Sequence, residues 1–176
     1  MRASVTANPR DNYKRPSLHV LLVDDDPNVL KDTSVRLGAE GHRVSVFSRA
    51  AGVRQLVCVL KPQVVLIDAL MPDLTKRMLL ELLAACRSSA EQPIVILHSR
   101  LSVRMLKTFV NLGNASGVIQ KTRSELEFML AFNSIVERAR ALNARFLSPE
   151  TAASGMHRIG TLSDEDVEEL RTGSTR

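Results

Sequence analysis

Five short apolar runs, separated by segments with helical periodicity, constrain the fold of this chain more than any other feature. Residues 64–67 and 94–97 are continuously apolar rather than alternating, which is typical of strands covered on both faces of a parallel sheet. We therefore predict an α/β fold with a parallel sheet at its centre. The predicted strands are residues 18–24, 43–48, 63–68, 94–99 and 117–121.

The segments between these strands have the apolar spacing of amphipathic helices. In the first of them, Val29, Leu30, Thr33 and Leu37 share one helical face, and Gly41 follows as a stop signal. Short connections between the elements complete a doubly wound α/β domain. The further predicted helices are residues 50–60, 75–88, 102–113 and 123–143.

The two ends of the chain differ in composition from its centre. Residues 1–16 are polar and mostly basic, and we predict a disordered basic extension there. The predicted domain spans residues 17–146, and residues 147–176 form a polar linker and an acidic tail. In that tail, Ser163 and Asp166 have the spacing that caps one short helix. No second core is predicted there, so we expect no attached output domain.

Charge and hydropathy narrow the class of protein. The net charge is +5, but the basic residues are scattered rather than gathered into a stripe with aromatics, so we expect no direct DNA binding. No apolar stretch approaches the roughly 20 residues of a membrane-spanning helix, and the start of the chain has no apolar signal core. We therefore expect a cytoplasmic protein without membrane association. Cys58 and Cys86 lack metal-ligand spacing, and we predict that both are reduced and structural.

Four of the predicted strands end in side chains suited to metal or phosphate chemistry. Ligands of an open parallel sheet bind beyond the carboxyl ends of the strands, so we expect these side chains at one edge. Neighbouring carboxylates repel each other, and a divalent cation relieves that repulsion. An all-oxygen ligand set suits Mg²⁺ better than Zn²⁺. The residues at these four strand ends are Asp24, Asp25 and Asp26, then Asp68, Ser99 and Lys121.

This combination of groups predicts phosphoryl chemistry. One carboxylate can act as a nucleophile toward phosphorus, while Mg²⁺ and the lysine ammonium neutralise charge on the equatorial oxygens. A hydroxyl group supplies a further hydrogen bond. Taken singly, adjacent acids after a strand are often only a helix start, and a lone lysine is usually a surface residue. The hypothesis depends on all four features occurring in this order at strand ends.

The segments VLLVDDDP, VVLIDALMP, ILHS and GVIQK resemble the four signature segments of response regulator receiver domains. Together they cover about residues 18–143. The resemblance implies a flavodoxin-like (βα)5 receiver fold with a five-stranded sheet in the order 2-1-3-4-5. It also implies a phosphoacceptor of a bacterial two-component system rather than an enzyme, with slow autodephosphorylation at most.

The resemblance further implies roles for individual residues. Asp25 and Asp68 would bind Mg²⁺ or Mn²⁺ directly, Asp24 would act through water, and the backbone carbonyl of Leu70 would complete the protein ligands. Asp68 would accept the phosphoryl group from a histidine kinase or a phosphotransfer protein. Lys121 would then pair with that phosphate.

We assign the hydroxyl position of the family to Ser99 rather than to His98. Counting forward from Pro93 would place His98 there. The interval from Ser99 to Lys121 is 22 positions, however, which matches the usual family spacing. We therefore expect Ser99 to contact the phosphate and His98 to have no phosphoryl-carrying role.

Several positions depart from the family pattern. Arg100 stands where the family prefers a small residue, Lys76 lies near the usual glycine, and Val118 replaces a common aromatic residue. Arg100 would cover the site, slow the entry of phosphodonor or water, or touch the phosphate itself, and the sequence does not choose among these roles. Without the aromatic ring at position 118, we expect signalling through the loop after Ser99 and the helix predicted over residues 102–113.

That predicted helix has a wide apolar stripe, which includes Leu106, Phe109 and Val110. We expect about half of the stripe to belong to the core. The remainder, together with the strand predicted at 117–121 and the helix predicted at 123–143, is the expected surface for a downstream protein partner. The protein is then a monomer or a phosphorylation-dependent homodimer.

Two alternative functions remain open. A pseudo-receiver would keep the fold and the acids but act as a protein-binding module without phosphorylation, and the departures at Lys76, Arg100 and Val118 motivate it. A phosphatase of the haloacid dehalogenase type also has an Asp-x-Asp arrangement after its first strand, here Asp24 and Asp26. That family needs a later acidic pair at another strand end, whereas residues 164–169 lie outside any strand pattern.

Overall fold

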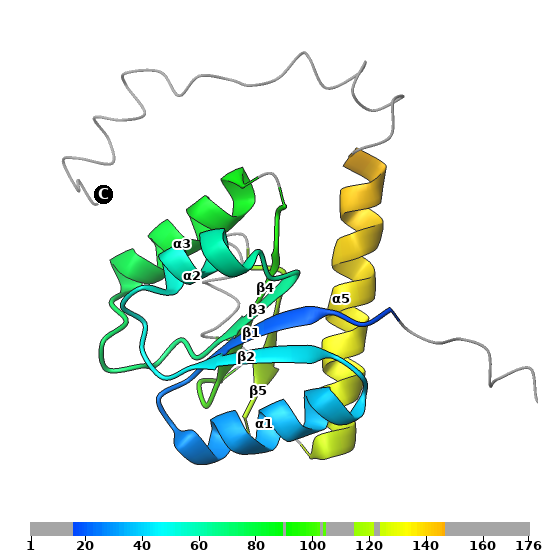
Figure 1. The fold of residues 1–176 in the computed structure, drawn as a ribbon, viewed down its shortest axis with the longest axis horizontal. Coiled ribbons are helices and arrows are strands. Elements are labelled where there is room, and N and C mark those ends of the chain that lie inside the picture. Colours follow the sequence, from blue (N-terminus) through cyan, green and yellow to red (C-terminus); the bar gives the residue numbers. More distant parts are fainter. Residues whose placement is uncertain (1–15, 90, 103, 105–114, 122–123, 147–176) are drawn as a thin grey trace, which may run out of the picture. The chain divides into compact units, whose positions relative to one another are not determined.

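The computed structural model describes residues 16–89, 91–102, 104, 115–121 and 124–146, and at its centre lies one parallel sheet (Figure 1). The strands are arranged in the order β2-β1-β3-β4-β5, and every neighbouring pair is parallel. The predicted fold class and strand order are therefore confirmed. The strands are β1 (His19–Val23), β2 (Arg43–Phe47), β3 (Val64–Ile67), β4 (Ile94–Ser99) and β5 (Gly117–Gln120).

Helices cover both faces of the sheet (Figure 1). They are α1 (Pro27–Ala39), α2 (Val53–Leu60), α3 (Lys76–Ser88) and α5 (Glu125–Phe146). Of the helix predicted over residues 102–113, only residues 102 and 104 are described, and Leu106, Phe109 and Val110 lie outside the described residues. The chain divides into two compact units after Ala139, and the described part of the second unit is the end of α5. Among the described residues, no helix is long and apolar enough to cross a membrane.

The fully apolar strands supply side chains to two separate cores, one on each face of the sheet. Successive residues of a strand point to opposite faces, so Leu21 and Ile67 pack with α2 and α3 while Leu22 and Leu66 pack with α1 and α5. Each such side chain contributes about 1.5–3 kcal/mol when it is fully buried. Burial on both faces explains why these strands lack an alternating polar pattern.

The turn between β1 and α1 is short because its last residue begins the helix. The Asp26 side chain accepts hydrogen bonds from the backbone N–H groups of Asn28, at 2.9 Å, and Val29, at 3.4 Å. These bonds satisfy two of the N–H groups that the first turn of a helix leaves unpaired. Pro27 follows at the first helical position, where its missing N–H costs nothing. The turn therefore holds Asp24 and Asp25 at the end of the strand.

Gly117 allows α5 to pack closely on β5. A Cβ atom at this position would lie 2.7 Å from Cδ1 of Ile135 and 2.9 Å from its Cγ2. Ile135 is itself buried in the core between the sheet and α5, so it has little room to move away. The absence of a side chain at Gly117 thus sets the spacing between the strand that precedes Lys121 and the helix behind it.

We predict that Gly117→Ala lowers the free energy of unfolding by about 1–2 kcal/mol, because overpacking outweighs the gain from removing a strand glycine. The measurement is urea unfolding. Combined with Ile135→Ala, the substitution should cost less than the sum of the two single changes. Gly38→Ala is the control, because nothing lies within 4 Å of the added atom, and it should be neutral or stabilising. Additive losses in the double variant would contradict the proposed clash.

Candidate functional site

The carboxyl ends of the strands bring the predicted site residues to one edge of the sheet. Ladder hydrogen bonds continue one residue past the strands and fix the backbone of three of these residues. They run from Asp24 N to Phe47 O at 3.1 Å, from Asp68 N to Val23 O at 2.9 Å, and from Lys121 N to Ser99 O at 3.1 Å. The side chains that follow are therefore placed by the sheet itself rather than by long loops.

Asp24, Asp25 and Asp68 form an acidic cluster. One oxygen from each carboxylate lies within 4.8 Å of the other two. Asp24 and Asp68 are buried, whereas Asp25 is exposed, so the cluster opens to solvent on the Asp25 side. Burial thus keeps two of the three carboxylates away from water, so the repulsion between them is only weakly screened.

The ammonium group of Lys121 lies inside this acidic cluster. Its Nζ is 2.6 Å from Asp68 Oδ2, and it lies 2.7 Å and 2.9 Å from the two carboxylate oxygens of Asp24. Burial alone would lower the pKa of Lys121, but hydrogen bonds to Asp24 and Asp68 outweigh it, and the pKa is raised. Burial raises the pKa of Asp24, and the hydrogen bond from Lys121 opposes that shift. The lysine is therefore a stable cation at neutral pH.

The acidic cluster fits a hard divalent cation. Three carboxylates face one ammonium, so negative charge remains in excess when all of them are ionised. Oδ2 of Asp24 is buried and accepts no well-aligned hydrogen bond from a described residue, although Lys121 lies close to it. This oxygen keeps the capacity to accept a cation, and an all-oxygen donor set is the one that Mg²⁺ prefers. Leu70 holds Asp68 in place, since its N–H donates to Asp68 Oδ1 at 2.9 Å.

Ser99 and Val118, two further positions singled out in the sequence, have different surroundings. Ser99 is fully buried at the end of β4, and from the described residues its hydroxyl oxygen accepts one long hydrogen bond, 3.4 Å, from Leu101 N. Val118 lies opposite Leu97 in the sheet and packs against the core on the α3 side. Ser99 thus stands at the edge with the acids, while Val118 lies among core side chains.

Arg100 forms an ion pair that the sequence analysis missed. Its Nη2 lies 3.1 Å from Oδ2 of Asp26, while Oδ1 of Asp26 caps α1. The pair joins the residue after β4 to the turn after β1, and the backbone N–H of Asp26 donates to Asp24. The three consecutive acids indicated that one of them caps the helix. The conformation of the Arg100 side chain, however, is set by the folded structure and could not be inferred from the sequence.

His98 is buried on the opposite face of β4 from the α2 and α3 core. Its side chain is only 4% exposed and packs edge-on against Phe128, with 5.5 Å between ring centroids. Burial lowers the pKa of His98 to about 4, the positive charges of Lys121 and Arg36 add to this, and Asp68 opposes it. The ring is therefore a neutral core side chain, a packing role that the sequence analysis did not assign.

Residues 20–133 match the family model described as the response regulator receiver domain. Among curated proteins, the transcriptional regulatory protein KdpE of Mycobacterium tuberculosis is 28% identical over 81 residues, which cover 46% of this chain. That match spans only 34% of the length of KdpE, so the chain corresponds to about a third of that relative.

Solved structures show the same fold at low identity. The chemotaxis response regulator CheY4 of Vibrio cholerae superimposes with a TM-score of 0.60 at 17% identity, over 68% of this chain and 99% of its own. A CheY-like response regulator receiver domain protein from Methanospirillum hungatei also gives a TM-score of 0.60, at 20% identity, over 72% of this chain and 98% of its own. These likenesses establish the fold, and the chemistry has to be inferred from the residues of the site.

We predict that His98 makes the stability of the protein depend on pH. In the unfolded chain the ring takes a proton near pH 6.5, whereas in the folded protein it does so only near pH 4. The unfolded state therefore binds more protons between these values, and stability falls as the pH decreases through this range. The loss approaches about 3 kcal/mol.

Urea unfolding of the wild type and of His98→Leu, at about pH 7.5 and about pH 5, measures this effect. The unfolding free energy of the variant should fall less on acidification than that of the wild type. His19, whose pKa is also lowered by burial and by Arg43, should account for part of the slope that remains. Parallel pH profiles for the two proteins would contradict the prediction.

Proposed function

The chain belongs to the response regulator receiver domain family, and from this we propose that Asp68 accepts a phosphoryl group from a histidine kinase or a phosphotransfer protein. The observation that carries the proposal is the position of the Lys121 ammonium, 2.6 Å from Asp68 and 2.7 Å from Asp24. A buried cation at this distance can neutralise charge on a phosphoryl group that reaches Asp68. Receiver domains are signalling domains, and the proposed role is that of a phosphoacceptor.

We assign the metal site of this reaction to the acidic cluster, with the backbone carbonyl of Leu70 as a further ligand. The excess negative charge of the cluster supports this assignment, as does the buried Oδ2 of Asp24, which accepts no well-aligned hydrogen bond from a described residue. When bound, Mg²⁺ or Mn²⁺ neutralises charge on the oxygens of the transferring phosphoryl group.

The protein's own residues orient and activate the nucleophile. The N–H of Leu70 fixes one carboxylate oxygen of Asp68, and Lys121 fixes the other, so the group is held in one rotamer. A bond forms between an Asp68 oxygen and phosphorus as the bond from phosphorus to the donor's imidazole nitrogen breaks, and that nitrogen leaves with its electron pair. The resulting acyl phosphate remains paired with Lys121.

We assign to Ser99 the hydroxyl that contacts the phosphoryl group. Its position at the end of β4, between β3 and β5, supports this role, as does the length of its hydrogen bond with Leu101 N, 3.4 Å, the one that its hydroxyl makes with a described residue. A hydroxyl with a weak partner can rotate toward a new acceptor at little cost. Movement of Ser99 would then also move the residues that follow it, beginning with Arg100 and Leu101.

The signal leaves the domain through a protein contact in this proposal. The proposed surface combines residues 102–113, including Leu106, Phe109 and Val110, with β5 and α5. Within the described part of that surface, Leu126 and Leu130 are exposed and lie one helical turn apart on α5. Such a pair suits a downstream partner or a second phosphorylated copy. We propose a cytoplasmic location for this exchange.

We predict that the wild type gains one phosphoryl group when it is incubated with a small acyl phosphate and Mg²⁺, as measured by intact mass. Asp68→Ala should gain none, and chelation of the metal should abolish the addition to the wild type. Asp32→Asn is the matched control, because it neutralises an exposed aspartate of α1 outside the acidic cluster and should behave as the wild type does.

Two other outcomes would contradict this proposal. No addition together with undetectable Mg²⁺ binding would favour the pseudo-receiver. Repeated turnover of simple phosphomonoesters would favour the phosphatase, although Asp26, the second acid of its Asp-x-Asp pattern, is already engaged with Arg100 and the start of α1.

We predict that Arg100→Ala speeds both phosphorylation by the small donor and hydrolysis of the phosphorylated protein. The ion pair between Arg100 and Asp26 lies at solvent level beside the acidic cluster, and its removal widens access. An exposed pair is worth at most about 1 kcal/mol, so the increase should not exceed about five-fold. Arg100→Lys keeps the charge and should change the rates less. A slower transfer in Arg100→Ala would show instead that the guanidinium contacts the phosphoryl group.

A further inference from the structure

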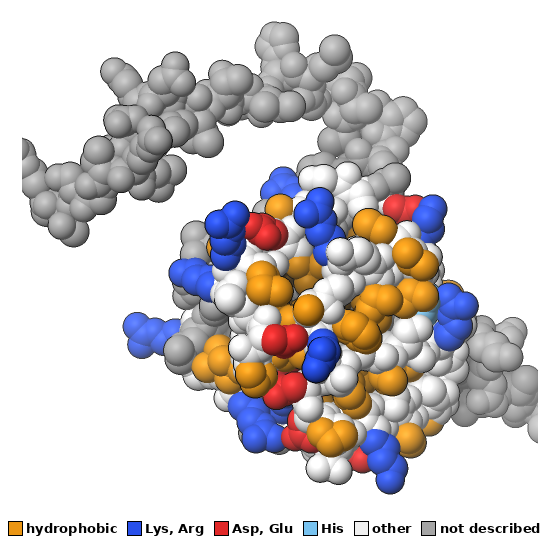
Figure 2. All heavy atoms as spheres, turned by 60° about the vertical axis from the view of Figure 1, so that its left-hand side comes forward, with side chains coloured by type: hydrophobic (Ala, Val, Ile, Leu, Met, Phe, Trp, Pro, Cys, Tyr) orange, Lys and Arg blue, Asp and Glu red, His pale blue; other side chains and the backbone are white. Residues whose placement is uncertain are grey.

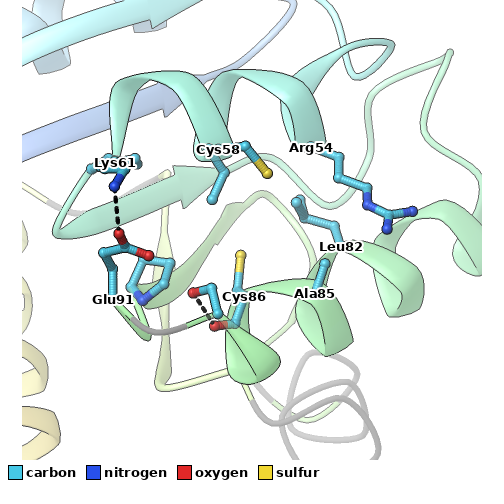
Figure 3. A pocket seen from close by; sticks show the side chains of 11 residues that line it. Arg54, Cys58, Lys61, Leu82, Ala85, Cys86 and Glu91 are labelled. Atoms are coloured by element: carbon cyan, nitrogen blue, oxygen red, sulfur yellow. Dashed lines mark hydrogen bonds and ion pairs between the residues drawn. The ribbon is translucent and has the colours of Figure 1, made fainter.

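A cavity of about 280 Å³ lies between α2 and α3, and the proposed phosphoryl chemistry does not use it (Figure 3). Its walls come from α2, from the second half of α3 and from the segments that lead into β3 and β4. Because those segments enter the strands at their amino ends, the cavity lies at the opposite edge of the sheet from Asp68. It is therefore a separate feature from the acidic cluster.

The walls of this cavity are mainly apolar. A dry engineered cavity of about 150 Å³ is enough to bind benzene, so the space here accepts a larger body, such as two fused rings or a branched aliphatic group. Several of the lining residues are already buried without any ligand, which means that the walls are formed in advance. The apolar lining residues are Val57, Pro62, Leu82, Ala85 and Pro93.

The only two cysteines of the chain face each other across the same space. Figure 3 shows the sulfur of Cys58 directed from α2 toward α3 and that of Cys86 directed from α3 toward α2. Burial raises the pKa of Cys86 to about 11, and Cys58 adds to the shift. Cys86 is therefore a neutral thiol, which behaves as a small polarizable apolar group in the wall.

Charged side chains lie at the two ends of the cavity, but only one end is neutralised (Figure 3). At one end, Lys61 Nζ lies 3.0 Å from Glu91 Oε1, so the two charges offset each other. At the other end, Arg54 makes no ion pair or hydrogen bond with any residue in the described part of the chain. The cavity therefore offers an unused guanidinium, the group that best matches the two oxygens of a carboxylate.

The neutralised end is held in shape by unusual backbone. Lys61 and Gln92 are the only non-glycine residues of the described chain with positive φ, at 46° and 38°. Lys61 lines this end, and Gln92 lies between the lining residues Glu91 and Pro93. The N–H groups of Lys61 and Gln92 are fixed by Val57 O at 3.0 Å and by Ser89 Oγ at 3.1 Å. Backbone of this kind is costly for an L-residue and persists where the surroundings hold it, often at ligand sites.

We propose that the cavity between α2 and α3 binds a small organic anion with an aromatic or branched apolar body, whose carboxylate pairs with Arg54. The apolar walls and the Cys86 thiol receive the body, and the ion pair of Lys61 with Glu91 lies at the far end. The site requires no metal and no phosphorylation, so it stands independently of the function proposed for Asp68.

Calorimetric titration of the full chain with 2-naphthoate, in the absence of Mg²⁺ and of any phosphodonor, tests this proposal. We expect saturable binding of one molecule per chain, and weaker binding of the uncharged isostere 2-naphthylmethanol. Arg54→Gln should weaken the binding of 2-naphthoate by about ten-fold or more and leave that of the alcohol unchanged. Equal affinity for acid and alcohol, or no effect of Arg54→Gln, would overturn the assignment of the anion.

A second pair of variants tests the cavity itself. Ala85→Phe places a ring inside it and should abolish the binding of both probes, whereas Ala84→Phe, on the exposed neighbouring position, should not. Circular dichroism and urea unfolding confirm that each variant is folded. Bound 2-naphthoate should also slow the modification of Cys58 by a thiol reagent. Absence of saturable binding in the wild type, or its survival in folded Ala85→Phe, would overturn the proposal.

Discussion

The buried contact of Lys121 with Asp24 and Asp68 is the interaction on which the rest of the site depends. Removing charges from water costs several kcal/mol for each ion, and attraction repays that cost only where the geometry is close. Here the ammonium lies within 2.9 Å of three carboxylate oxygens, and its side chain is only 6% exposed. Burial of the acids without the lysine, or of the lysine without the acids, would leave an unpaired charge and would be strongly unfavourable. The cluster is therefore a unit, and its position dictates what chemistry the edge of the sheet can perform.

The strand order explains how a unit of this kind arises from residues so distant in sequence. β1 and β3 are neighbours, so the short side chains of Asp24 and Asp68 meet directly. β5 is separated from β3 by β4, and only a long side chain can reach across. Lysine provides that length, and Ser99, on the intervening strand, is small enough to leave the path open. The side-chain lengths thus follow from the distance of each strand to the centre of the site.

Sequence patterns predicted the strands and the acidic cluster because both depend on features of short sequence segments. A continuous apolar run marks a covered strand, and a polar residue just after it marks the carboxyl edge. Features set by tertiary contacts were missed, such as the pairing of Arg100 with Asp26 and the burial of His98 against Phe128. The predicted start of α2 at residue 50 was also too early. Ala50 instead donates its N–H to Asp73, and Gly52 has a φ of 91°, which is incompatible with a helix.

Hydrophobic side chains lie between charged ones on the face of the molecule that brings the α2 and α3 side of Figure 1 forward (Figure 2). The helices differ in how well their ends are capped. α1 and α3 each have 13 residues and a side-chain N-cap, whereas α2 has eight residues, no side-chain cap and left-handed residues at both ends. Its stability must come from packing against α3 and the sheet, so the cavity between the two helices removes part of its support. The clearest polar anchor at its start is Asp73, in the loop that follows Asp68, which accepts the N–H groups of Ala50 and Ala51. A physical connection thus runs from the proposed phosphoacceptor loop to α2, and the cavity is lined by residues of the same helix.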